Sequence, residues 1–94
     1  MNPGRLSGRP QLRGTMVKTI HAPAYSRLLV ALRARRIEMG MSQRQAASRL
    51  GMGRTWLGKI EQGDRRLDAL ELYRLCRLYE VRWADIEPLL RGHP

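Results

Sequence analysis

Apolar residues recur at helical spacing along most of the chain after residue 23. The first such segment contains four of them: Leu28, Leu29, Leu32 and Ile37. Their spacing predicts a helix over about residues 24–38, and Gly40 follows it, as glycine commonly does at the end of a helix. No segment shows the alternation of apolar and polar residues that is typical of a strand.

Two short helices are expected next, joined by a turn that contains glycine. Ser42 and Gln45 have the S-x-x-Q spacing of a capping box, which predicts the start of the first of these helices. It should end near Leu50, because Gly51 can adopt the left-handed conformation that closes a helix. The second short helix is expected over about residues 53–62.

Two further helices complete the pattern. Asp68 and Glu71 repeat the capping-box spacing and predict a helix that runs to about Tyr79. Residues 83–91 are expected to form a last helix, which Pro88 would either end early or divide into a new turn. The sequence therefore predicts an all-α domain of five helices, in which helices two and three form a helix-turn-helix.

The charge of the chain narrows the choice of partners. Its 18 Lys and Arg residues outnumber its 8 Asp and Glu residues, and the net charge is +10. Such a balance favours nucleic acid, an anionic membrane surface or an acidic protein. Most of these cations are Arg, whose planar guanidinium matches phosphate and guanine, although a GC-rich coding sequence would give the same composition. No apolar run approaches the roughly 20 residues of a membrane span.

Residues 1–22 differ from the remainder of the chain. They lack apolar periodicity, contain Pro and Gly, and carry four basic residues without an acidic one: Arg5, Arg9, Arg13 and Lys18. We predict a flexible basic tail over residues 1–22 and a helix-turn-helix DNA-binding domain over residues 23–94. The tail would contact DNA, or it is no more than a solvated leader; a true start at Met16 is a further alternative.

Residues that could perform chemistry are scarce. The single cysteine, Cys76, excludes an internal disulfide and indicates a reduced, cytoplasmic setting. Its place on the inner face of the fourth expected helix favours an inert core thiol. No metal-ligand spacing, paired carboxylates or nucleophile–base pair is apparent, so we expect no enzyme, no metal and no cofactor.

The third expected helix has a basic side opposite an apolar one. A rotation of about 100° per residue brings Leu57 and Ile60 together, whereas Thr55 and Lys59 face away and Arg54 reaches sideways. A helix of this kind fits the major groove, where each base pair presents a distinct pattern of donors and acceptors. Arg54, Thr55 and Lys59 are therefore the expected base contacts.

Other polar side chains are expected at DNA phosphates. Gln43 and Arg44 lie in the first turn of the second helix, where free backbone N–H groups favour a phosphate. Arg65 and Arg66 follow the third helix and would hold phosphates on the far side of the groove. Trp56 flanks the apolar side of the third helix, and we favour packing in the core over stacking on a base.

Several spaced segments together are typical of one family: Met41-Ser42-Gln43, Ala47, Leu50-Gly51, Lys59-Ile60-Glu61-Gln62-Gly63 and Asp64-Arg65-Arg66-Leu67-Asp68. With these segments, the chain from about Leu32 to Leu90 resembles the lambda-type repressor domain of the Xre/Cro-like helix-turn-helix family. The last segment is similar to one found in a subgroup of small members.

The resemblance implies five helices, with the first half of the third in the major groove and Gln43 on a phosphate. It also implies an ion pair between Arg36 and Glu61. Ala46 departs from the family pattern, because a larger apolar residue is common there, so Met39 or Met41 would fill the core instead. Gly53 and Gly58 also replace polar residues, which shortens the list of contacts expected from the third helix.

These patterns predict a sequence-specific regulator that binds double-stranded DNA and represses transcription by occupying a promoter. A homodimer is expected, with a contact surface on the last helix formed by Trp83, Ile86, Leu89 and Leu90. Burial of Trp83 and Leu89 within one chain would favour a monomer. The alternatives are an antitoxin-like or coactivator-like protein-interaction module with secondary DNA binding, and charge-driven binding to any nucleic acid or anionic membrane.

Overall fold

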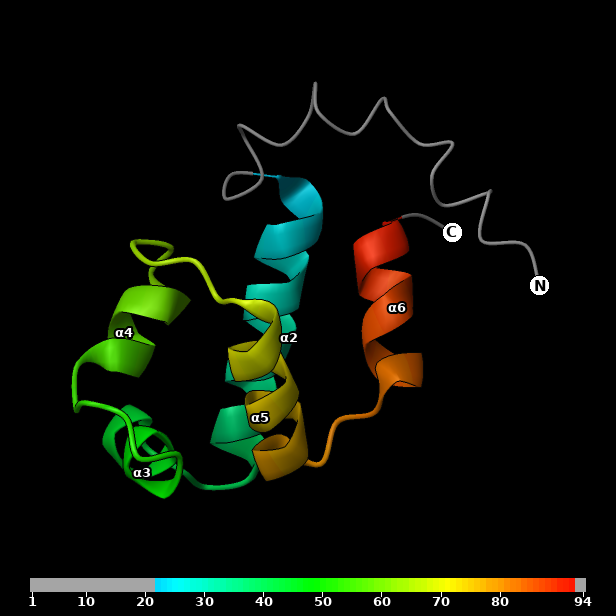
Figure 1. Ribbon diagram of the computed structural model, residues 1–94. Coiled ribbons are helices and arrows are strands. Elements are labelled where there is room, and N and C mark those ends of the chain that lie inside the picture. Colours follow the sequence, from blue (N-terminus) through cyan, green and yellow to red (C-terminus); the bar gives the residue numbers. More distant parts are fainter. Residues whose placement is uncertain (1–21, 93–94) are drawn as a thin grey trace.

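The computed structural model describes residues 22–92 and shows five helices without a strand in that range. In chain order they are α2 (Pro23–Glu38), α3 (Gln43–Arg49), α4 (Trp56–Glu61), α5 (Ala69–Tyr79) and α6 (Trp83–Arg91). Helices α3 and α4 lie on one side of α2, and α6 lies on the other (Figure 1). The all-α fold expected from the sequence is confirmed, whereas residues 1–21 of the tail expected over residues 1–22 lie outside the described residues.

Both predicted capping boxes are present. Ser42 Oγ accepts a hydrogen bond from the Gln45 N–H at 3.0 Å, and Gln45 Oε1 accepts one from the Ser42 N–H at 2.8 Å. Asp68 Oδ1 accepts from the Glu71 N–H at 2.7 Å, and Glu71 Oε1 accepts from the Asp68 N–H at 3.1 Å. Each box satisfies two backbone donors that the helix leaves unpaired, which fixes where α3 and α5 begin.

The expected start of the helix over residues 53–62 was wrong. Helix α4 begins at Trp56, and Arg54 and Thr55 lie in the turn before it. The Trp56 N–H donates to the Gly53 carbonyl at 3.1 Å, and the Thr55 side chain makes no capping hydrogen bond. Gly53 has no side-chain oxygen to cap an earlier first turn, so the chain forms a tight turn there instead.

Helix α6 covers the core with the face that was expected to form a dimer contact. It packs against α2, and Ile86 is only 2% exposed, so Ile86 belongs to the core of its own chain instead of an exposed dimer contact. Leu89 and Leu90 are half-buried, and Trp83 is exposed. The helix runs through Pro88 to Arg91, where Gly92 closes it in the left-handed conformation.

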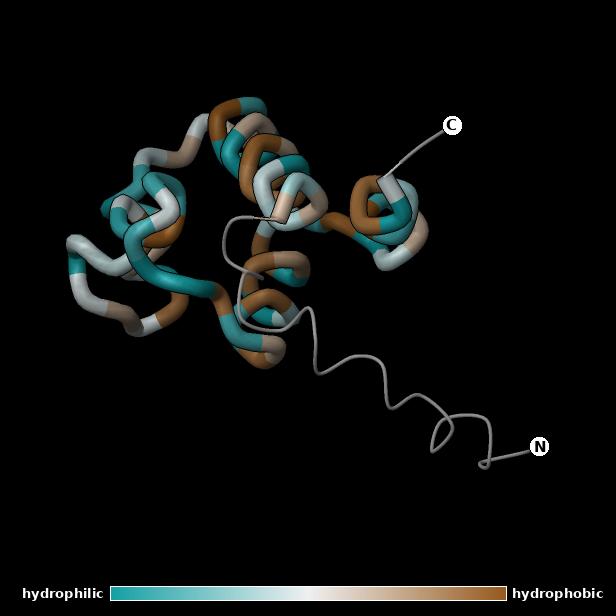
Figure 2. Tube along the Cα trace, turned by 90° about the horizontal axis from the view of Figure 1, so that it is seen from above, coloured by the Kyte–Doolittle hydropathy of each residue, from teal (hydrophilic) through white to brown (hydrophobic). Residues whose placement is uncertain are grey.

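One apolar core joins all five helices. Its buried residues are Tyr25, Leu28, Leu32, Met41, Ala46, Ala47, Trp56, Leu57, Ile60, Leu67, Leu75, Tyr79 and Ile86. Trp56 thus packs in the core as predicted, and Met41 is buried in the same core, whereas Met39 is only partly buried against it. Cys76 packs against this core, and burial raises the pKa of its thiol. Hydrophobic and hydrophilic stretches alternate along the helical turns, as expected when one side of each helix is buried (Figure 2).

A buried ion pair joins α2 to the last turn of α4. Arg36 Nε lies 2.8 Å from Glu61 Oε2, and Arg36 Nη2 lies 3.0 Å from Glu61 Oε1. The side chains of Arg36 and Glu61 are only 8% and 6% exposed. Arg36 Nη1 also donates to the Met41 carbonyl at 2.8 Å. The pair implied by the family resemblance is therefore present, and it holds α4 and the α2–α3 connection against α2.

Replacing Arg36 by Ala removes the nearest counter-ion of the buried Glu61 carboxylate, together with two hydrogen bonds to it. We expect Arg36→Ala to lower the free energy of unfolding by about 3–5 kcal/mol, as removal of one partner from a buried pair does. Urea denaturation measures this change. The matched control is Arg33→Ala, because Arg33 Nε lies 3.8 Å from Glu61 Oε1 on a side chain that is 59% exposed. The control should lose less than about 1 kcal/mol, and equal losses in the two variants would contradict the account.

Candidate nucleic-acid interface

A shallow concavity of about 400 Å³ lies between α3 and α4. Seven residues line it: Gln43, Arg44, Arg54, Thr55, Gly58, Lys59 and Gln62. Three of these residues are basic and none is acidic, so the surface carries positive potential and attracts anions. The structure thus brings together Gln43, Arg44 and the three base contacts expected from the sequence.

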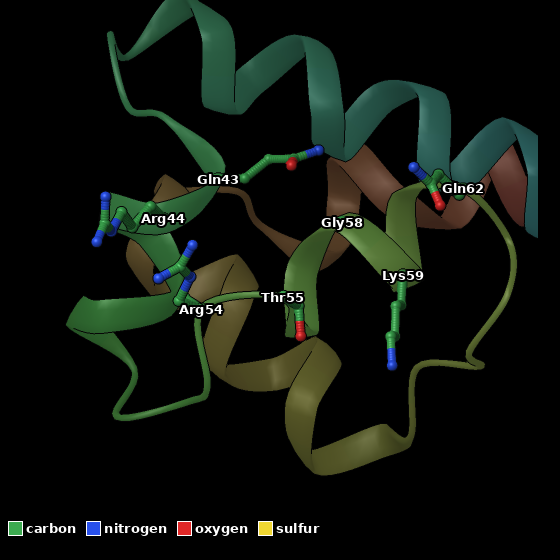
Figure 3. Close-up of a pocket in the computed structure, with 7 residues that line it drawn as sticks. All are labelled: Gln43, Arg44, Arg54, Thr55, Gly58, Lys59 and Gln62. Carbon is green, nitrogen blue, oxygen red and sulfur yellow. The ribbon is translucent and has the colours of Figure 1, made fainter.

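The basic side chains of this concavity come from three neighbouring segments. Figure 3 shows Arg44 on α3 and Lys59 on α4 with their charged groups extended away from the helices, and Arg54 on the turn before α4 with its charged group drawn across α3 toward Arg44. All three residues are exposed, and no acidic side chain within residues 22–92 pairs with them. Their charges are therefore free to meet an anionic ligand.

The Gln43 side chain runs inward between α3 and α4, unlike those of its basic neighbours (Figure 3). Its Nε2 donates to Glu61 Oε1 at 2.8 Å, so Gln43 is tied to the buried Arg36–Glu61 pair. An amide nitrogen carries two hydrogens, so one N–H remains for a second acceptor. This contact was not predicted from the sequence. Gln43 and Glu61 lie on different helices, and no local sequence pattern relates two such positions.

Arg65 and Arg66 lie on the loop after α4 and do not line the concavity. The Arg65 guanidinium meets the Glu71 carboxylate at two points, Nη1–Oε1 and Nη2–Oε2, both 2.9 Å long. Arg66 is exposed and forms no ion pair within the part of the chain that the structure describes. Of the two phosphate contacts expected on this loop, Arg66 is thus free, whereas Arg65 already holds an internal partner.

The comparison with known families adds an independent finding. Residues 25–89, more than half of the chain, match the helix-turn-helix domain family. The chain therefore belongs to this family of DNA-binding regulators, and α3, α4 and the turn between them form the helix-turn-helix. Comparisons with curated proteins and with solved structures gave no match.

Two other features are absent from residues 22–92. No group of three or more His, Cys, Asp and Glu side chains in that range could hold a metal ion. No helix among the same residues has both the length and the apolar character needed to cross a bilayer.

The Arg65–Glu71 contact predicts a pH dependence of stability. The hydrogen bonds from Arg65 hold the pKa of Glu71 below its usual value of 4.5, although burial opposes this shift. A carboxyl whose pKa is lowered by folding stabilises the fold above its unfolded pKa and loses that contribution as the pH falls through its folded pKa. The stability difference between the unaltered chain and Glu71→Gln should therefore shrink below about pH 4.5.

Urea denaturation over a series of pH values measures this difference. Glu87→Gln is the matched control, because Glu87 pairs with Arg91 four residues away on an exposed face of α6. Its stability difference from the unaltered chain should be small at every pH. A difference for Glu71→Gln that stays constant through the acid range would contradict the assigned role of the Arg65 pair.

Proposed function

We propose that the chain binds double-stranded DNA sequence-specifically and represses transcription by occupying promoters in the cytoplasm. The observation that carries this proposal is the concavity between α3 and α4, which has three exposed basic side chains and no acidic one. Family membership supports DNA binding in general. The proposed recognition of a particular DNA sequence rests on Arg54, Thr55 and Lys59, whose exposed side chains have the chemistry to contact base edges.

The proposed contacts divide into two groups with different consequences. Arg54 and Lys59 would donate to guanine O6 and N7, and Thr55 would contact a thymine methyl or a phosphate. Gln43, Arg44 and Arg66 would hold phosphates, which positions the domain without selecting a sequence. Arg65 would reach a phosphate only by giving up part of its contact with Glu71.

A homodimer through the side of the domain that carries α5 and α6 would place two such surfaces on one duplex. An apolar groove of about 360 Å³ lies between these helices, and its residues Tyr73 and Trp83 are 56% and 64% exposed. Arg77 is the one charged residue that lines it, and charged residues of both signs, Glu80, Arg82 and Asp85, are close in sequence to its lining residues Val81 and Trp83. In a chain of net charge +10, this balance lets two copies meet without strong repulsion. The spacing of half-sites in bound DNA tests the arrangement.

Two substitutions separate base recognition from phosphate binding. Lys59→Ala should relax the preference at one base position, where a good contact discriminates by about 1–3 kcal/mol. Arg66→Ala should weaken binding to all duplexes alike and reduce the salt dependence by about one counterion. Fluorescence anisotropy on a preferred duplex and on a scrambled one measures both effects.

Arg91→Ala is the matched control for the loss of a positive charge, since Arg91 is exposed at the end of α6 and lines neither the concavity nor the groove between α5 and α6. It should leave both affinities nearly unchanged. Identical losses on the preferred and scrambled duplexes from Lys59→Ala would remove Lys59 from the base contacts.

A further inference from the structure

Gly58 lies in α4, directly against the side chain of Gln43. A Cβ added at Gly58 would sit 3.2 Å from Gln43 Oε1, 3.8 Å from its Cδ and 4.0 Å from its Nε2. The first distance is shorter than an ordinary van der Waals contact between carbon and oxygen. Gly58 lies inside a regular helix and has no unusual backbone conformation. What the glycine provides is space, because it has no side chain beyond a hydrogen atom.

The orientation of the Gln43 amide is fixed from its other side. Gln43 Nε2 donates to Glu61 Oε1 at 2.8 Å, and Arg36 holds the same carboxylate with two hydrogen bonds. A carboxylate accepts hydrogen bonds and cannot donate them, so the NH₂ end of the amide must face Glu61. The oxygen of the amide then faces Gly58, where a larger residue would press on it.

We propose that Gly58 is a positioning residue for DNA binding, which lets Gln43 keep the orientation set by Glu61. In this orientation the second N–H of the amide is free to donate to a phosphate oxygen at the edge of the concavity. A Cβ at Gly58 would displace the amide, and its contact with the phosphate would weaken on every sequence alike. The inference deepens the proposed DNA-binding function and rests on it.

Gly58→Ala tests the proposal, because the predicted effects on stability and on binding differ. Alanine favours a helix over glycine by about 1 kcal/mol, which offsets the strain on the hydrogen bond between Gln43 and Glu61, so the melting temperature should change little. The Kd for preferred and scrambled duplexes should rise together, by about 3- to 10-fold, as expected when a hydrogen bond to a charged group is impaired. Gly53→Ala is the matched control, since no atom lies within 4 Å of a Cβ added there, and its Kd should not change.

The same substitution in a Gln43→Ala background distinguishes positioning from a direct clash with DNA. Without the Gln43 amide, Gly58→Ala should cause no further loss of affinity. A loss that persists in that background would mean that the added methyl meets the duplex itself, which overturns the proposal. The side-chain amide signal of Gln43 in NMR spectra of the free protein should also shift in Gly58→Ala and stay in place in Gly53→Ala.

Failure of this inference is distinguishable from failure of the proposed function. Suppose that the chain shows no preference among duplexes, and that Gly58→Ala still weakens binding to all of them only when Gln43 is present. This result would contradict specific recognition but would support the positioning role of Gly58. Specific binding that Gly58→Ala leaves intact overturns the positioning role alone. A chain that binds no duplex overturns both.

Discussion

A single buried carboxylate, that of Glu61, sets the geometry on which the interface depends. An ionised carboxyl that is 6% exposed must be compensated by nearby donors, or folding would be strongly disfavoured. Arg36 of α2 supplies the opposite charge, and Gln43 of α3 supplies a further hydrogen bond. Three helices meet at this one group, so α3 and α4 are held at a defined separation. The concavity between them follows from that separation.

Basic residues serve two purposes in this chain, and the presence of a neighbouring acidic residue decides which. Arg36 and Arg65 are drawn onto Glu61 and Glu71, where they stabilise the fold. Arg44, Arg54, Lys59 and Arg66 find no acidic partner among residues 22–92 and stay exposed. These four cations are thus displayed on the side of the molecule formed by α3, α4 and the loop that follows. An anionic duplex is the ligand that best matches a surface of this kind.

The sequence predicted features that depend on local signals and missed those that depend on packing. The capping boxes at Ser42 and Asp68 gave correct helix starts, because each involves residues three apart. The start of α4 was misplaced, because Gly53 gives no capping signal. Periodicity showed that Ile86 belongs to an apolar face of α6, but only the fold shows that α2 covers it. The Arg65–Glu71 contact and the inward amide of Gln43 were likewise out of reach, since they join different elements.

The central claim is that the concavity between α3 and α4 recognises a DNA sequence. The most direct test is the selection of bound sites from a pool of random duplexes. We expect enrichment of a defined sequence. For a two-fold dimer it should contain two related half-sites about 34 Å apart, which is one turn of the double helix. Substitution of Arg54 should change the enriched sequence. Recovery of duplexes without any shared sequence would contradict the claim and leave only charge-driven binding.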